Sequence, residues 1–104
     1  MAMSTNTISP VIALQAQAAV NLFLTEHLPD RFVVDQARFD LTNDNWRVLV
    51  ILAYPVIGSI GKVGEVVVSG ETEEILSYTR LEEMKRVAQE LYQAHQSDIE
   101  AAFS

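Results

Sequence analysis

Two histidines are the side chains best suited to acid–base chemistry near neutral pH, because an imidazole titrates close to that pH. They are His27 and His95, and each stands at the end of an apolar helical stripe. The carboxylates near them in the sequence are Glu26, Asp30 and Asp98, but no H-x-x-x-H or H-E-x-x-H spacing occurs. We therefore interpret both histidines as structural or solvent-edge residues.

The glycine-rich segment 58–64, Gly-Ser-Ile-Gly-Lys-Val-Gly, invites comparison with phosphate-binding loops. The pattern G-x-x-x-x-G-K-[ST] fails because Val56 stands in place of the first glycine and Val63 follows the lysine. The dinucleotide pattern G-x-G-x-x-G fails at Ile60. A turn or bulge between two strands explains these glycines better.

The other polar candidates also lack the spacing that their chemistry needs. The acidic segment 71–74 does not alternate Asp or Asn as calcium loops do, and it is better interpreted as a solvated hairpin tip. The serines of the strand region lie neither in G-x-S-x-G nor beside a candidate base. Because the chain has no cysteine, thiolate chemistry is excluded. We expect no catalytic residue, no cofactor and no metal, so an enzyme is the less favoured reading.

The charge balance limits the partners. Fourteen acidic residues oppose seven basic ones, giving a net charge of −7. This charge repels phosphate backbones, and the basic residues are scattered, so direct nucleic-acid binding is not expected. The apolar stretch 11–24 contains Gln15, Gln17 and Asn21 and is too short for a bilayer span. With no basic residue before Arg31, it predicts neither signal peptide nor anchor, which favours a cytoplasmic protein without a membrane partner.

Hydrophobic periodicity predicts the elements that position these residues. Ser9-Pro10 is typical of a helix start, and the helix ends before Pro29. Extended runs predict a bulged strand over 32–41 and a strand over 46–54, followed by strands over 63–69 and 75–78. The second strand is apolar on both faces, so we expect it to be central and covered on each side. The longest connection is expected over 55–61.

The C-terminal part predicts a second helix. Thr79 and Glu82 have the spacing of a capping box, and an apolar stripe runs from the expected helix start at Arg80 to His95. The residues from Gln96 onward have weak helical propensity. The 104 residues are therefore expected to form a lead-in over 1–8, one domain over 9–97 and a frayed tail over 98–104. The fold class is α+β: a helix, a four-stranded antiparallel sheet of hairpins and a C-terminal helix, with the sheet against one or both helices.

Apolar residues near the middle of the chain are the candidates for partner binding. Tyr54, Val56, Ile57 and Ile60 lie in or beside the connection after the second strand, and they either form an exposed patch or fold back onto the sheet. Trp46 is either a core anchor or an exposed hot spot.

The layout from Ala18 to Thr79 resembles PepSY domains, the peptidase-propeptide and YpeB type of module. Three features carry the resemblance: an alanine-rich helix, a W-x-V-x-V strand start at Trp46, and a Gly64-x-Val66-x-Val68 strand followed by Thr-Glu-Glu-Ile-Leu at 72–76. The family's last hairpin usually reads V-D-x-x-T-G-E-V, and here Ser69 and Glu73 stand for the aspartate and the glycine. The resemblance implies a non-catalytic module that binds or restrains another protein.

The chain as a whole also looks like short bacterial proteins encoded beside PIN-domain nucleases. That resemblance implies an accessory or antitoxin-like partner, since an acidic protein complements a basic RNA-binding surface. We expect a non-enzymatic interaction or regulatory domain that binds another protein or a second copy of itself. The alternative is a small-ligand-binding α+β roll or an enzyme, with a pocket between helix and sheet lined by His27, Tyr54 or Tyr92.

Overall fold

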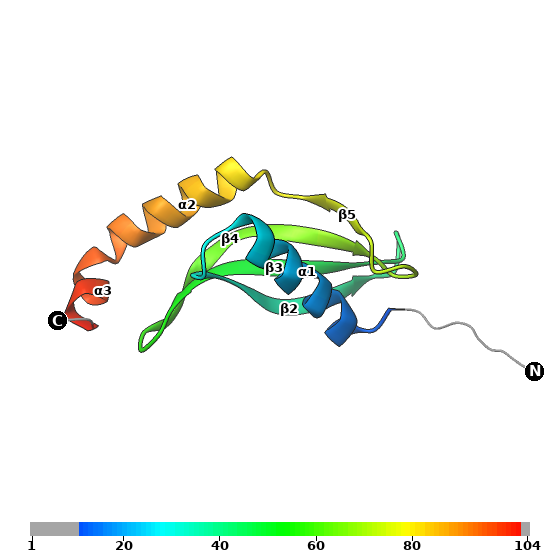
Figure 1. Ribbon diagram of the computed structural model, residues 1–104, viewed down its shortest axis with the longest axis horizontal. Helices are drawn as coiled ribbons and strands as arrows, with labels where there is room; N and C mark the ends of the chain where they lie inside the picture. The colour runs from blue at the N-terminus through cyan, green and yellow to red at the C-terminus, as the bar shows by residue number, and fades with distance from the viewer. Residues whose placement is uncertain (1–10, 103–104) are drawn as a thin grey trace, which may run out of the picture.

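A computed structural model describes residues 11–102, which form a four-stranded antiparallel sheet with helices on one face (Figure 1). The strands follow one another in the order β2-β3-β4-β5. The elements are α1 (Ala13–His27), β2 (Phe32–Asp40), β3 (Asn45–Tyr54), β4 (Gly58–Ser69), β5 (Ile75–Tyr78), α2 (Leu81–Ala94) and α3 (Gln96–Ala102). The predicted α+β fold, with helices before and after the sheet, is confirmed.

Helix α1 lies across the sheet and presents one residue per turn to it. Ala16, Val20 and Leu24 are buried at a spacing of four, as one face of an α-helix requires. The predicted start at Ser9-Pro10 lies outside the described residues, and the helix itself begins at Ala13, where the Gln15 side chain accepts the Ile12 N–H at 2.9 Å. The helix ends as predicted before the proline, with Leu28 in extended geometry.

The sheet is a meander of hairpins with irregular pairing. The register between β2 and β3 shifts between Val34 and Ala37, which confirms the predicted bulge in the first strand. The Gln17 side chain donates to the Asp35 carbonyl at this bulge, at 2.9 Å. Two further shifts in the β3–β4 pairing fall opposite the glycine-rich segment. The predicted long connection over 55–61 is wrong: β4 already begins at Gly58, because the glycines pair with β3 and leave only 55–57 in the turn.

Both long helices cover the same face of the sheet, so the expectation that β3 is covered on each side is wrong. Val48, Val50 and Leu52 are buried beneath the helices. Leu49 and Ile51 point to the other face and are only half-buried. That face also carries the paired charged residues that are described below. It can therefore face water without a covering helix.

Helix α2 lies close to β4 because glycines there have no side chain. A Cβ atom at Gly64 would lie 2.9 Å from Met84 Cγ, and one at Gly61 would lie 3.1 Å from the Leu91 methyl carbons. The predicted capping box at Thr79 is not formed: its hydroxyl accepts the Glu65 N–H at 3.0 Å, and the helix begins at Leu81 with no side-chain cap.

Residues 96–102 form the short helix α3, although a frayed tail was predicted from residue 98 onward. Its residue Ile99 is 3% exposed, and it lies outside the main cluster of buried residues. Apolar burial thus accompanies the helix where local propensity is weak.

The end of the sheet that carries Trp46 is hydrogen-bonded to Val11, just before α1. Trp46 donates its indole N–H to the Val11 carbonyl at 2.8 Å, and the Phe39 and Trp46 rings form a T-shaped pair with centroids 5.0 Å apart. Val11 in turn donates its N–H to the Gly70 carbonyl at 2.9 Å. Gly70 is necessary here, because a Cβ atom would lie 2.6 Å from the Asp44 carbonyl oxygen.

Replacing this glycine is expected to destabilise the fold. Gly70→Ala places a methyl group against backbone rather than against a flexible side chain, so two turns must move apart, at a cost of about 1–3 kcal/mol in the free energy of unfolding. Urea denaturation followed by Trp46 fluorescence measures it. The neighbouring exposed change Glu71→Ala is the control and is expected to stay within about 0.5 kcal/mol of the parent. Equal stabilities of the two variants would contradict the close packing.

Candidate functional site: a groove beside the second helix

An open groove of about 400 Å³ lies on the helical face of the sheet. This volume falls in the range of about 300–1,000 Å³ that is usual for binding sites. The groove lies between the side of α2 and the loop that follows α1, where β2 begins and β3 ends. Its lining residues are Pro29, Arg31, Phe32, Leu52, Tyr54, Lys85, Ala88, Gln89 and Tyr92.

Each side of the groove comes from a different element. The apolar residues Phe32, Leu52 and Ala88 are largely buried, and they belong to the main core cluster. Helix α2 contributes four lining residues, Lys85, Ala88, Gln89 and Tyr92, at positions i, i+3, i+4 and i+7 of one stripe. This stripe is distinct from the positions of Met84 and Leu91, which pack on β4.

The aromatic residues stand at one end of the groove. The Tyr54 and Tyr92 rings lie with their centroids 6.3 Å apart. The Arg31 guanidinium carbon lies 5.0 Å from the centroid of the Tyr54 ring, within the range of a cation–π interaction. The protein therefore presents aromatic and cationic groups together beside an apolar floor.

The charge of the groove is opposite to that of the whole chain. Arg31 and Lys85 line it, and no carboxylate does. On another side of α2, Arg86 is paired with Glu83 and Glu90, and its hydrogen bond lowers the pKa of the Glu83 carboxyl below its usual value. No ion pair of Lys85 or Arg31 occurs among residues 11–102.

The predicted partner-binding residues do not form one patch. Tyr54 lines the groove, whereas Val56 stands at the tip of the β3–β4 hairpin, 84% exposed and with a positive φ of 57°. Ile57 is half-buried, and Ile60 packs against the main core. Trp46 lies at the opposite end of β3, with its indole engaged as described above. Only Tyr54 of these five residues lines the groove.

Sequence reasoning missed the contributions of Arg31, Lys85 and Gln89. The i, i+3, i+4, i+7 spacing from Lys85 to Tyr92 is visible in the sequence, but the apolar stripe on the neighbouring face of the same helix is stronger. Arg31 has no pattern of its own. Its place follows from the helix stop at Pro29, which turns the chain back into β2.

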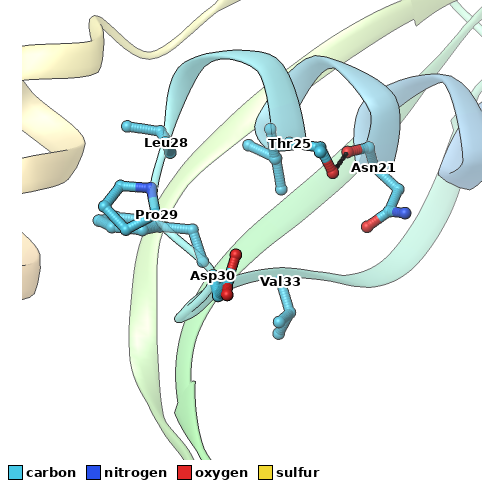
Figure 2. A pocket seen from close by; sticks show the side chains of 8 residues that line it. Asn21, Thr25, Leu28, Pro29, Asp30 and Val33 are labelled. Atoms are coloured by element: carbon cyan, nitrogen blue, oxygen red, sulfur yellow. Dashed lines mark hydrogen bonds between the residues drawn. The ribbon is translucent and has the colours of Figure 1, made fainter.

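A second hollow of about 230 Å³ lies between the last turns of α1 and the loop into β2 (Figure 2). Its walls include Asn21, Thr25 and Asp30. The Thr25 hydroxyl donates to the Asn21 carbonyl at 2.9 Å, so its proton is already used within the helix. With one carboxylate and a smaller volume, this hollow is the weaker candidate for binding.

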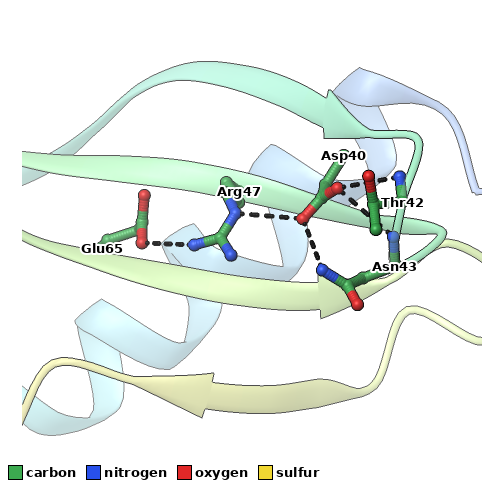
Figure 3. A network of polar contacts seen from close by, with 5 residues as sticks. All are labelled: Asp40, Thr42, Asn43, Arg47 and Glu65. Atoms are coloured by element: carbon green, nitrogen blue, oxygen red, sulfur yellow. Dashed lines mark hydrogen bonds and ion pairs between the residues drawn. The ribbon is translucent and has the colours of Figure 1, made fainter.

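A polar network crosses the face of the sheet opposite the helices (Figure 3). Arg47 bridges two carboxylates, with Nε 3.3 Å from Asp40 Oδ2 and Nη1 3.0 Å from Glu65 Oε1. Asp40 also accepts the backbone N–H groups of Thr42 and Asn43 and the Asn43 side-chain amide. These bonds, the Asn43 amide first, lower the pKa of the Asp40 carboxyl. The network fastens the β2–β3 turn and has no unsatisfied charge to offer a ligand.

The histidines are not brought together with acidic groups. His27 Nδ1 lies 2.9 Å from the Phe23 carbonyl oxygen, and His95 Nδ1 lies 3.0 Å from that of Leu91. Because a carbonyl only accepts, Nδ1 carries the proton in each ring. Within residues 11–102, no three His, Asp or Glu side chains are grouped to hold a metal ion. In the same part of the chain, no helix is long and apolar enough to cross a membrane.

Comparison with known proteins adds no relative. No protein-family model, curated protein or solved structure matches the chain. The groove is therefore the main indication of function.

The lowered pKa of Asp40 predicts a loss of stability in acid. The folded-state pKa is below the unfolded value near 3.8, so the stabilisation is complete above that value and disappears as the pH falls through the folded pKa. At pH 7 the parent protein is expected to be more stable than Asp40→Asn, and the difference is expected to shrink below about pH 4. Urea denaturation of both proteins at several pH values measures it. A difference that is the same at every pH would contradict the assignment.

Proposed function

We propose that this protein is a non-enzymatic interaction domain that binds another protein in the groove between α2 and the loop that follows α1. The observation that carries the proposal is the combination of an apolar floor, two tyrosines and two cations in a hollow that is open to solvent. Tyrosine and arginine are among the side chains that most often contribute binding energy at protein interfaces.

The shape of the groove favours a polypeptide. The stripe from Lys85 to Tyr92 spans eight residues of helix, and its seven steps of 1.5 Å correspond to about 10 Å of groove wall. A groove of this length beside a helix fits an amphipathic segment whose apolar side chains point at the floor. The floor residues Leu52 and Ala88 already belong to the core, so the site is preformed and little must be ordered on binding.

The β3–β4 hairpin lies at the same end of the molecule as the groove. Its tip projects beyond the rest of the sheet on the side where α2 and α3 lie (Figure 1). Val56 at this tip and Tyr54 at its base offer apolar contacts to a partner larger than the groove. This supports the predicted role of the hairpin, with the binding site shifted toward α2.

The regulatory character of the protein is a prediction from the sequence. The PepSY-like features and the likeness to proteins encoded beside PIN-domain nucleases favour an inhibitory or antitoxin-like partner in the cytoplasm. Self-association through the same groove is the alternative form of such an interaction.

A small-molecule ligand is the second candidate for the same groove. It is favoured by one observation: Tyr54 and Tyr92, two of the three residues named above for a ligand pocket, both line the groove. His27, the third residue of that expectation, is not among the lining residues. A small ligand would be less completely enclosed here than in most ligand pockets, which bury about 70–90% of the ligand surface.

Removing one aromatic wall of the groove is expected to release the partner. Tagged parent protein, Tyr92→Ala and Leu41→Ala are purified from the cell that makes the protein, and the bound proteins are identified by mass spectrometry. Leu41 is the control because it is an apolar side chain that is 88% exposed, in the distant β2–β3 turn. We expect one stoichiometric protein with the parent and Leu41→Ala, reduced at least about tenfold with Tyr92→Ala.

Two results would contradict the proposal. One is a partner that binds Tyr92→Ala as well as the parent, which would place the interface elsewhere. The other is recovery of the protein without any partner, including after crosslinking. In that case a thermal shift of the parent with a small-molecule library, absent in Tyr92→Ala, would establish the second candidate.

A further inference from the structure

We infer that the segment held in the groove is an acidic amphipathic one, with apolar side chains flanked by carboxylates. This inference rests on the proposed function, since it names the chemistry of the partner at the same site. The argument comes from where the positive charges of an acidic protein are placed.

Most basic residues of the chain are located away from the groove or are already paired. Arg47 and Arg86 each contact two carboxylates. Arg38 and Lys62 pair in register with Arg47 and Ile51, so they point to the face of the sheet opposite the helices. Arg31 and Lys85 differ because they line the same hollow and no acidic residue lines it with them.

The apolar floor makes the two cations of the groove selective for a carboxylate. A carboxylate that enters beside Leu52 and Ala88 loses part of its hydration, and it needs a cation within reach to offset that loss. Arg31, held over the Tyr54 ring, is a positioned cation rather than a freely moving one. A lysine or arginine of a partner would meet like charge at the same place and would be disfavoured.

Outside the groove, the surface of the protein does not favour an acidic partner. The net charge of −7 repels an acidic segment from the molecule as a whole, so binding depends on the local field of the groove. Affinity is therefore expected to depend on Arg31 and Lys85 individually.

The test selects ligands without assuming their sequence. A random peptide library displayed on phage is selected on the full-length protein, after depletion on the Tyr92→Ala variant. We expect enriched peptides to carry aromatic or aliphatic residues flanked by Asp and Glu. Enrichment of basic or uncharged peptides would overturn the inference, as would the absence of any peptide that distinguishes the parent from Tyr92→Ala.

Matched charge variants then test the two cations. The affinity of one selected peptide is measured by calorimetry for Arg31→Gln and Lys85→Gln, with Arg38→Gln and Lys62→Gln as controls that make the same charge changes on the other face of the sheet. We expect each groove variant to weaken binding about three- to tenfold, and each control less than about twofold. Equal effects of groove and control variants would overturn the local role of the cations.

The outcomes separate this inference from the proposed function. If the cellular partner is lost with Tyr92→Ala but binds Arg31→Gln and Lys85→Gln like the parent, the groove binds a protein and the inferred chemistry of the partner is wrong. If the cellular partner is not lost with Tyr92→Ala, both are wrong.

Discussion

The close seating of α2 on β4 is the constraint on which the rest of the architecture depends. Glycines at positions 61 and 64 let Leu91 and Met84 lie directly against the strand, at distances that a side chain on either glycine would occupy. Thr79 bonds to Glu65 just before the helix and sets the point at which the chain leaves the sheet. Because α2 is held over β4, it leaves an open groove between itself and the loop that joins α1 to β2.

The same seating determines which groups the groove presents. One stripe of α2 packs on the strand, a second carries the ion pairs of Arg86, and the stripe that contains Lys85 and Tyr92 faces the end of β3. A helix rotated by one residue would move each stripe by about 100° and bring different side chains to the groove. Charge, aromatic surface and apolar floor are thus consequences of a packing contact, and the site needs no strained or unsatisfied group to be useful for recognition.

Much of the fold follows from the sequence, because strand alternation, turn residues and the proline stop are local signals. The bulge between Val34 and Ala37 and the helix end before Pro29 are examples. What the sequence did not predict depends on tertiary geometry: Thr79 prefers a strand partner to a capping role, and the glycine-rich segment pairs in the sheet. The site was found only in part. Tyr54 was identified, but the residues beside it come from elements that only the folded chain brings together.

The most direct test of this account is a nuclear Overhauser measurement on the isotopically labelled protein. We expect contacts from the Gly61 α-protons to the Leu91 methyl groups and from the Gly64 α-protons to the Met84 side chain. Missing contacts at both glycines would contradict the seating of α2 on β4.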